Sequence, residues 1–173
     1  MDPVNSVTMP DNHCVGHGRL LKWLGWSLVV VVADQFSKYL AGHYLELHEP
    51  VAVLPLVNLT LAHNTGAAFS FLSSASGWQR WFFVILALCV STIILFWLKR
   101  LPVRQSRQAM SLSLILGGAL GNVWDRIQFG YVIDFIDLYY DRWHWPVFNI
   151  ADSAITAGAV LLIIDTLISR KQR

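Results

Sequence analysis

Two aspartates lie in segments of the chain that are otherwise apolar. Asp134 is in the stretch GYVIDFID, and Asp152 is in FNIADSAI, where a long apolar run begins. Two carboxyl groups that share one site do not both ionise easily, so one of them keeps its proton. The carboxylate can then activate a water molecule while the protonated partner polarises a carbonyl group, which is a route to amide hydrolysis. We therefore take Asp134 and Asp152 as a candidate catalytic pair.

Each acid also has a less specific interpretation. Asn149 is a good N-cap residue, and Asp152 follows it at the third helical position, where an acid can reach back to the cap. The positive end of the helix dipole favours a carboxylate there as well. Asp137 and Asp141 are alternative partners for Asp134, although the stretch DLYYDRWHW that contains them is typical of a solvated loop. The sequence leaves open which acids meet.

Further polar residues lie in apolar segments at helical spacing. Asp34 and Lys38 are four residues apart, so on a helix they would form an ion pair. Such a pair either only stabilises its helix or belongs to a functional site, because charged side chains inside a membrane usually face the protein interior. Asn122 and Arg126 have the same spacing and therefore share a helix face.

The apolar segments have the length of membrane-spanning helices. The chain has 173 residues, of which 55% are hydrophobic and only 14% are charged, whereas a soluble domain is about 25% charged. A spanning helix needs about 20 mostly apolar residues. We predict four transmembrane helices, over about residues 20–40, 79–99, 107–126 and 150–169. Gly117 and Gly121 form a GxxxG pattern in the third, which indicates either close helix packing or a groove for a lipid chain.

The basic residues predict how these helices are oriented. Most of the thirteen Lys and Arg residues lie before the first helix, between the second and third, or after the fourth. The positive-inside rule therefore predicts cytoplasmic termini, with segments 41–78 and 127–149 outside. A cleavable signal peptide at residues 19–33 is the alternative for the first helix, but a polar tail precedes it and the helical pattern continues beyond it. We expect a flexible cytoplasmic tail at 1–18 and one membrane-embedded domain at 19–173.

The longer outer segment has a pattern of its own. Residues 53–61 alternate in part between apolar residues and Pro, Asn and Thr, which favours short strands. Aromatic residues such as Trp78, Trp81 and Trp143 are typical of a membrane boundary. We expect a small outer β-sheet and a short interfacial helix over the outer ends of the spans.

The chain offers no clear pattern for a metal, a cofactor or a nucleic acid. Cys14 lies in the tail and Cys89 in the middle of a predicted helix, so a disulfide between them is not expected. The stretch HCVGH in the tail lacks a second cluster at structural-zinc spacing. The net charge is only +2, with the basic residues in loops that flank the helices.

The order of the polar motifs resembles that of a known family. Five blocks carry the resemblance: DQFSK at 34–38, NTGAAFSF at 64–71, GGALGNVWDRI at 117–127, GYVIDFID at 130–137 and FNIADSAI at 148–155. One block alone would be a weak signal, but five in this order and spacing are specific. Over about residues 20–169, the chain is similar to bacterial lipoprotein signal peptidase, also called signal peptidase II.

The resemblance implies an aspartic endopeptidase of the bacterial inner membrane, without cofactor or metal, that cuts diacylglyceryl-modified prolipoproteins just before the lipidated cysteine. It also implies four transmembrane helices, a small periplasmic β-cradle with an interfacial helix, an active site near the periplasmic face and inhibition by the cyclic lipopeptide globomycin. We expect a monomer in contact with membrane lipid. The family's catalytic pair falls on Asp134 and Asp152. Its substrate-binding or supporting residues fall on Asp34, Lys38, Asn64, Gly66, Asn122, Arg126, Asn149 and Ala151.

The polar residues have expected roles, and two other functions remain open. Asn64 and Asn149 would bind the substrate backbone or orient the acid pair, and Arg126 would pair with an acid or a substrate carbonyl. His63 departs from the family pattern and is expected to face solvent. One alternative is a proton-coupled transporter that uses the acids as a relay, although the chain lacks a pseudo-repeat. The other is a structural membrane subunit whose acids only cap helices.

Overall fold

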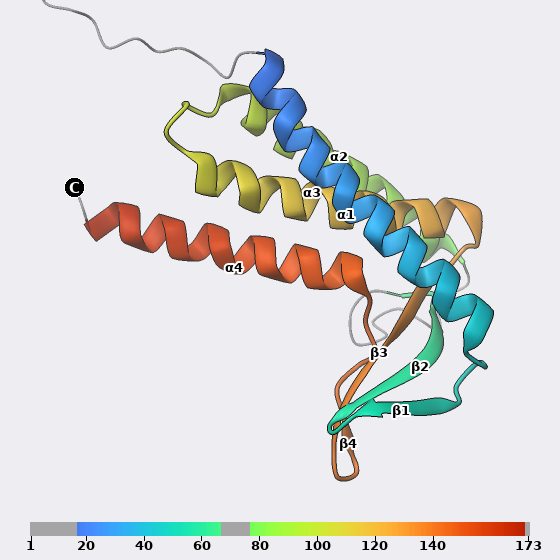
Figure 1. The fold of residues 1–173 in the computed structure, drawn as a ribbon. Helices are drawn as coiled ribbons and strands as arrows, with labels where there is room; N and C mark the ends of the chain where they lie inside the picture. The colour runs from blue at the N-terminus through green and yellow to red at the C-terminus, as the bar shows by residue number, and fades with distance from the viewer. Residues whose placement is uncertain (1–16, 67–76, 172–173) are drawn as a thin grey trace, which may run out of the picture.

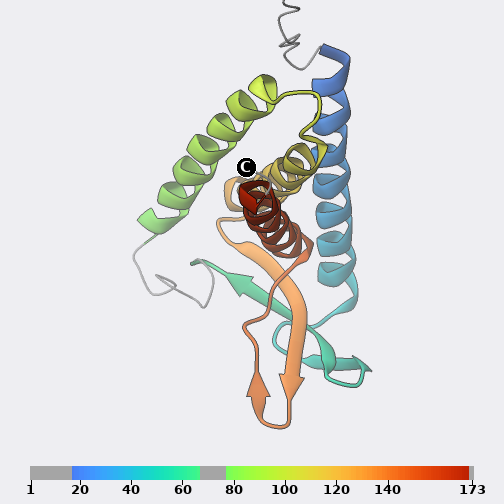
Figure 2. The ribbon, with the colours of Figure 1, turned by 90° about the vertical axis from the view of Figure 1, so that its left-hand side faces the viewer.

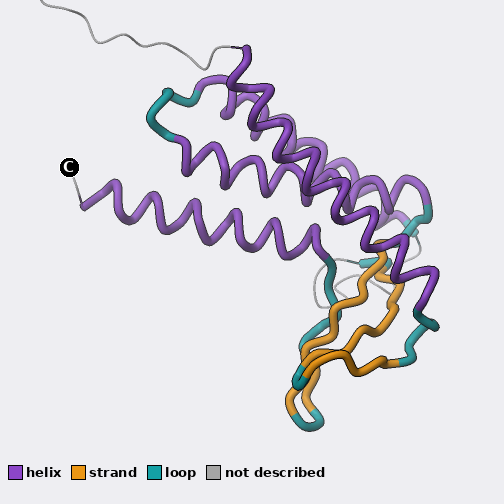
Figure 3. The backbone as a smooth tube through the Cα atoms, in the orientation of Figure 1, coloured by secondary structure: helices purple, strands orange, loops and turns teal. Residues whose placement is uncertain are grey.

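The computed structural model of the chain describes residues 17–66 and 77–171. Four long helices and four strands follow one another along these residues (Figure 1). The helices are α1 (His17–Tyr44), α2 (Trp78–Arg100), α3 (Ser106–Gln128) and α4 (Ile150–Lys171). The strands are β1 (Pro50–Leu54), β2 (Val57–Asn64), β3 (Val132–Tyr140) and β4 (Trp143–His144). The strands lie together at one end of the helices, and the start of α1 and the end of α4 lie at the other (Figure 3).

α3 is the central helix of the bundle. It packs against α1, α2 and α4, and Figure 2 shows α1 and α2 on either side of it. Many of its residues are small or apolar and buried, such as Leu112 and Leu116. The other three helices expose large apolar side chains, such as Val29, Ile93 and Ile163. Exposed apolar surface on this scale is expected of helices that face lipid.

Three helices of the described part of the chain are long and apolar enough to cross a membrane. They are Gly18–Tyr44, Trp78–Arg100 and Ile150–Ile168, which confirms three of the four predicted spans. α3 coincides with the helix predicted at 107–126 but is less apolar, because serines and glycines stand where it contacts its neighbours. A fourth crossing by α3 stays a prediction.

Two glycines of α3 allow α1 to approach closely. A Cβ atom added at Gly117 would lie 2.6 Å from the backbone oxygen of Ser27. One added at Gly121 would lie 2.6 Å from Oδ2 of Asp34. Such distances are too short for a real side chain, so glycine is required at both positions. The GxxxG pattern therefore serves helix packing, in agreement with the first of its two interpretations.

The strands form one antiparallel sheet in the order β1-β2-β3-β4. In the pairing of β2 with β3, Ala62 lies opposite Asp134. Ala41 of α1, Leu61 of β2 and Phe135 of β3 form a small core between bundle and sheet. The predicted small sheet is confirmed, and this core fixes β3 relative to α1.

The sheet includes residues that the sequence assigned to a solvated loop. The stretch DLYYDRWHW, 137–145, forms the end of β3 and all of β4, and Asp137 within it is buried. The loop assignment is wrong because these residues pair as strands and Asp137 is buried, whereas Leu138 and residues 140–145 are exposed, as expected of a solvated segment. The preceding residues 132–137 of β3 are buried or half-buried on both faces, and such a strand lacks the alternation of apolar and polar residues that marks a half-exposed strand.

Two predicted features fall mostly outside the described residues. The interfacial helix is predicted within residues 41–78. Residues 45–66 contain no helix, and residues 67–76 lie outside the described part of the chain. Of the flexible tail predicted at 1–18, only the last two residues are described, and they belong to α1.

Candidate active site

β3 carries Asp134 to the junction between sheet and bundle. Asp134 is only 2% exposed, and pairing of β3 with β2 sets it near Asn64, the last residue of β2. Asn64 Nδ2 donates a hydrogen bond to Asp134 Oδ2 (3.0 Å), and Asn149 Nδ2 donates one to Oδ1 (2.7 Å). An amide N–H therefore holds each oxygen of the Asp134 carboxyl.

The start of α4 brings Asp152 to the same region. Asn149 caps the helix, because its Oδ1 accepts a hydrogen bond from the backbone N–H of Asp152 (2.8 Å). The Asp152 side chain accepts a hydrogen bond from Asn122 Nδ2 of α3 (2.8 Å). The capping interpretation is therefore right for Asn149, whereas the Asp152 carboxylate is bound to a different helix.

Asp134 and Asp152 line one cavity of about 830 Å³. Asn64, Asn122 and Arg126 line it as well. Much of the remaining wall is apolar and comes from the end of β3, the segment that leads into α4 and the first turns of α4: Leu138, Trp145, Pro146, Val147, Phe148, Ile155 and Ala157. A cavity of this size, mainly apolar with a few converging polar groups, is typical of a ligand-binding site.

Two buried amides connect the acids. Asn149 Nδ2 lies 3.2 Å from Asn122 Oδ1. Asp134, Asn149, Asn122 and Asp152 therefore form one continuous chain of hydrogen bonds. Because buried polar networks with satisfied partners are rigid, this chain keeps the two carboxyl groups in a defined arrangement.

Burial and the second acid change the protonation of Asp134. Removal of the carboxyl from water, together with the negative charge of Asp152, raises the pKa of Asp134 from 3.8 to about 7. The hydrogen bond from Asn64, the charge of Lys38 and the hydrogen bond from Asn149 lower this pKa by smaller amounts. Asp134 is therefore able to hold a proton close to neutral pH.

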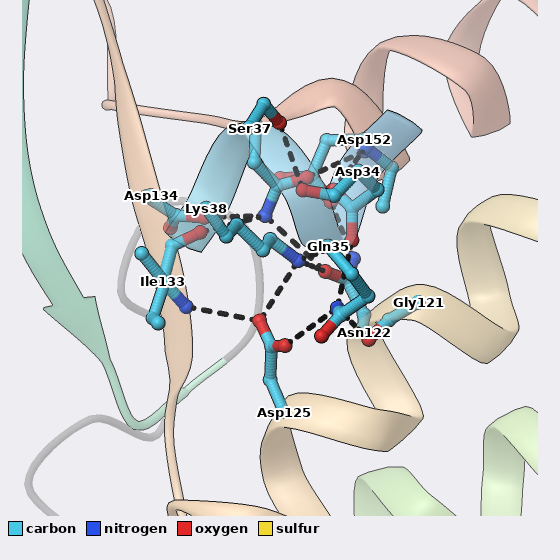
Figure 4. Close-up of polar contacts among 12 residues, drawn as sticks. Asp34, Gln35, Ser37, Lys38, Gly121, Asn122, Asp125, Ile133, Asp134 and Asp152 are labelled. Atoms are coloured by element: carbon cyan, nitrogen blue, oxygen red, sulfur yellow. Dashed lines mark hydrogen bonds and ion pairs between the residues drawn. The ribbon is translucent and has the colours of Figure 1, made fainter. Parts of the chain in front are cut away.

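Lys38 lies at the centre of a second polar cluster (Figure 4). Its Nζ lies 2.7 Å from Asp34 Oδ2, 2.8 Å from Asp125 Oδ2 and 3.0 Å from Asn122 Oδ1. Gln35 Nε2 joins the two acids, because it donates to Asp34 Oδ2 (3.1 Å) and to Asp125 Oδ1 (2.8 Å). Lys38 and both acids are buried. The predicted ion pair of Asp34 with Lys38 is confirmed.

Arg126 ties the end of β2 to the bundle. Its Nη2 donates a hydrogen bond to the backbone oxygen of Gly66 (2.8 Å), and its guanidinium lies over the ring of Phe83, 5.2 Å from the centroid. The backbone N–H of Gly66 donates to Asn64 Oδ1 (3.0 Å). Arg126 and Gly66 thereby help to hold Asn64 beside Asp134.

The ten site residues predicted from the sequence come together at this end of the bundle, in two groups. One group lines the cavity: Asn64, Asn122, Arg126, Asp134 and Asp152. The other group does not line the cavity but contacts the first group or its neighbours: Asp34, Lys38, Gly66, Asn149 and Ala151.

The cluster around Lys38 contains two residues that the prediction omits. Gln35 and Asp125 both contact Asp34 or Lys38 directly. Asp125 follows Asn122 by three residues, so the two share a helix face. That spacing is the signal by which the sequence could have identified Asp125, whereas nothing about Gln35 except its place beside Asp34 distinguishes it.

The alternative partners of Asp134 lie elsewhere. Asp137 is three residues from Asp134, and side chains alternate between the two faces of a strand. On the other face of β3, Asp137 contacts Thr60 Oγ1 (3.1 Å) and His144 Nδ1 (2.8 Å). Asp141 lies in an exposed turn. Neither lines the cavity, so Asp152 is the acid that shares it with Asp134.

His63 is exposed, as predicted, but it also contributes to the cavity wall. Its ring stacks on Tyr131, with 4.0 Å between the ring centroids. His48 lies on the same wall, and the partial burial of the His63 ring, together with the charge of this second histidine, lowers the pKa of His63.

The fold and the site together define a class of protein. Three described helices can cross a membrane, and two acids share a cavity where the bundle meets the sheet. The chain is therefore a multi-pass membrane protein with a carboxyl pair suited to acid–base chemistry.

Comparison with known proteins identifies the family. Residues 26–168 match the family model of signal peptidase II. The chain is 56% identical to the lipoprotein signal peptidase of Acinetobacter baumannii (strain ATCC 17978) over 88% of this chain and 87% of the relative. It is 51% identical to the lipoprotein signal peptidase of Pseudomonas fluorescens (strain Pf0-1) over 94% of this chain and 96% of the relative. The chain belongs to the signal peptidase II family and is therefore a peptidase.

Two solved structures share the fold, and both are of bacterial membrane enzymes determined by the in meso method. The structure at 2.3 Å resolution has a TM-score of 0.77 and 29% sequence identity, over 92% of this chain and 94% of its own. The structure at 1.9 Å resolution has a TM-score of 0.76 and 30% sequence identity, over 90% of this chain and 97% of its own. The shared fold therefore extends over nearly the whole chain.

Proposed function

We propose that this peptidase is an aspartic endopeptidase that removes the signal peptide from diacylglyceryl-modified prolipoproteins by cutting just before the lipidated cysteine. The observation that carries the proposal is that Asp134 and Asp152, from different elements, meet at one cavity. Relatives that are named lipoprotein signal peptidases support the substrate class. Membership of a peptidase family leaves the transporter and the structural subunit without support.

Asp134 is the acid of the proposed pair, and Asp152 is the base. The raised pKa of Asp134, about 7, lets it keep a proton. Asp152 lies in the first turn of α4, where the helix dipole stabilises a carboxylate. Its carboxylate takes a proton from the water that attacks the scissile carbonyl carbon, while Asp134 donates a hydrogen bond to the carbonyl oxygen. When the tetrahedral intermediate collapses, the proton on Asp152 passes to the leaving nitrogen.

Other residues of the cavity bind and orient the substrate. Asn64 and Arg126 line the cavity beside the acids, and an amide and a guanidinium group suit the backbone carbonyls of an extended peptide. The apolar wall from Trp145 to Phe148 suits apolar side chains of the substrate, because their burial removes apolar surface from water. No cofactor or metal takes part in this mechanism.

The membrane supplies one part of the proposed specificity. With α3 as a fourth span, the basic residues predict that both termini are cytoplasmic and that the sheet and cavity lie at the periplasmic face of the inner membrane. The diacylglyceryl group then stays in the bilayer and presents the neighbouring peptide bond to the cavity, which contributes to the rate by proximity. The protein acts as a monomer, and a globomycin-type lipopeptide inhibits it by occupying the cavity.

Cleavage of a lipidated precursor tests the proposal directly. The purified protein in phospholipid vesicles should cut a diacylglyceryl prolipoprotein before the modified cysteine, as identified by mass spectrometry of the product. The same precursor without lipid should be cut at least about 100-fold more slowly, because its scissile bond is not held at the membrane. Equal cleavage of the two precursors would refute the role of the lipid. Failure to cut either, by protein that is folded and inserted, would refute the peptidase assignment.

The rate of cleavage should fall as the pH rises above about 7. Asp134 must be protonated to donate a hydrogen bond to the substrate, and its pKa in the folded protein is about 7. Above that pH the protonated fraction decreases by about tenfold for each pH unit. The measurement is kcat/KM for a lipidated precursor between about pH 5 and pH 9. A rate that stays constant or increases up to the highest pH would contradict the assignment of Asp134 as the acid.

A further inference from the structure

The two acids next to Lys38 each bind the backbone immediately before a member of the catalytic pair. Asp34 Oδ1 accepts a hydrogen bond from the N–H of Ala151 (2.9 Å), the residue before Asp152. Asp125 Oδ2 accepts one from the N–H of Ile133 (3.2 Å), the residue before Asp134 (Figure 4). The same two carboxylates hold the Lys38 ammonium from both sides, at 2.7 and 2.8 Å. One buried charge cluster thus contacts the backbone of α4 and of β3.

Lys38 also determines which way the amide of Asn122 faces. An ammonium group is only a donor, so the Asn122 atom 3.0 Å from Nζ must be the oxygen. The Nδ2 group of the same amide then faces Asp152, to which it donates at 2.8 Å. If the amide were reversed, its N–H would meet the ammonium and its oxygen would meet the carboxylate, which are both repulsive contacts.

The same constraint reaches Asp134 through Asn149. Asn122 Oδ1, held by Lys38, also accepts from Asn149 Nδ2 (3.2 Å). The backbone N–H of Asp152 requires the opposite atom of that amide, Oδ1, to face it (2.8 Å). Asn149 Nδ2 is therefore directed toward Asp134 Oδ1, at 2.7 Å.

We propose that Lys38 is a positioning residue for peptide cleavage: with Asp34 and Asp125 it fixes the backbone and the amide donors that hold Asp134 and Asp152. The inference rests on the proposed catalytic roles of those two acids. Lys38, Asp34 and Asp125 are buried and do not line the cavity, so they act through Asn122, Asn149 and the backbone and not by contact with substrate.

The charges around Asp134 decide what loss of Lys38 does to its proton. Three charged groups interact with Asp134: Asp152 of α4, Arg126 of α3 and Lys38 of α1. Two histidines, His63 of β2 and His48 before β1, line the same cavity. The charge of Lys38 and the hydrogen bond from Asn149 both lower the pKa of Asp134. Removal of Lys38 eliminates the first contribution, so Asp134 should keep its proton to a higher pH.

Two variants test the inference in the full-length protein in phospholipid vesicles. Lys38→Met keeps an unbranched side chain, one atom shorter, and removes its charge. Because it leaves two buried carboxylates without a partner, the triple variant Lys38→Met/Asp34→Asn/Asp125→Asn is made as well. In the triple variant, amide oxygens can still accept from Ala151 and Ile133, so chiefly the orientation of Asn122 is lost. Thermal unfolding identifies the folded fraction of each protein.

Positioning predicts a specific kinetic pattern. For the folded fraction, kcat on a lipidated precursor should fall about 100-fold, while KM stays within about threefold of the parent. In Lys38→Met, the alkaline limb of the pH profile should move to higher pH by about half a unit or more. Arg107→Met is the matched control, because Arg107 pairs with Asp165 (4.0 Å) at the other end of α3. Its loss should change neither kcat nor the pH at which the rate begins to fall.

A purely structural role gives a different result. If both Lys38 variants have the parent kcat and pH profile per folded molecule, or if neither one folds, the cluster only stabilises the bundle and the positioning role is refuted. The catalytic pair is judged separately by Asp134→Asn and Asp152→Asn. If those two proteins are inactive while the Lys38 variants behave as the parent, the proposed function stands and only the inference about Lys38 fails.

Discussion

Purified Asp134→Asn and Asp152→Asn proteins are expected to cleave a lipidated prolipoprotein at least about 10³-fold more slowly than the parent. An amide at position 152 cannot take a proton from the attacking water. An amide at position 134 can still donate a weak hydrogen bond, but it has no acidic proton with which to stabilise the developing oxyanion. Because Asn has nearly the volume of Asp, both proteins should remain folded and inserted, so the loss is expected in kcat. Single-turnover cleavage of a purified lipidated precursor measures it.

Asp141→Asn is the matched control for the two acid variants. Asp141 lies in an exposed turn at φ 54°, a conformation that Asn adopts readily, so cleavage should stay within about twofold of the parent. Asp137→Asn tests the alternative partner, which contacts His144 and Thr60 on the other face of β3. Full activity of either Asp134→Asn or Asp152→Asn, or equal losses in Asp137→Asn and Asp152→Asn, would overturn the catalytic pair.

The sequence predicts those contacts of the site that depend on spacing within one element. The ion pair of Asp34 with Lys38 follows from a separation of four residues on one helix, and the structure has it at 2.7 Å. The N-cap by Asn149 follows in the same way from its place just before an apolar run. Both are contacts within one element or at its end, where the backbone geometry alone brings the atoms together.

Contacts between different elements could not be predicted from spacing. Lys38 meets Asp125, which is distant in the sequence, and its position there depends on how α1 crosses α3 at Gly117 and Gly121. β3 escaped detection because residues 132–137 are buried or half-buried on both faces. The sequence assigns Asp137 to a solvated loop because most of the residues that follow it are polar or aromatic, and most of these are exposed in the structure. The choice of Asp152 over Asp137 as the partner of Asp134 depended on the family resemblance, and the geometry of β3 now gives it an independent reason.

Asn149→Ser and Asn149→Ala are expected to separate the two tasks of Asn149, which caps α4 and donates to Asp134. A serine Oγ can still accept the N–H of Asp152, as Asn149 Oδ1 does at 2.8 Å, so the cap survives in Asn149→Ser and is lost in Asn149→Ala. The difference in unfolding free energy between the two variants should be about 1 kcal/mol in favour of serine. Thermal or denaturant unfolding of both proteins in the same detergent measures it.

Activity should not follow this difference in stability. A serine side chain is too short to reproduce the donor that Asn149 Nδ2 supplies to Asp134 Oδ1 at 2.7 Å and the link to Asn122 at 3.2 Å. Both variants should therefore lose about 100-fold in kcat for a lipidated precursor, since a misplaced reacting group has effects of that order. A serine variant with the parent kcat would mean that the donor to Asp134 is dispensable. If Asn149→Ser is as unstable as Asn149→Ala, Asn149 does not stabilise α4 through its cap.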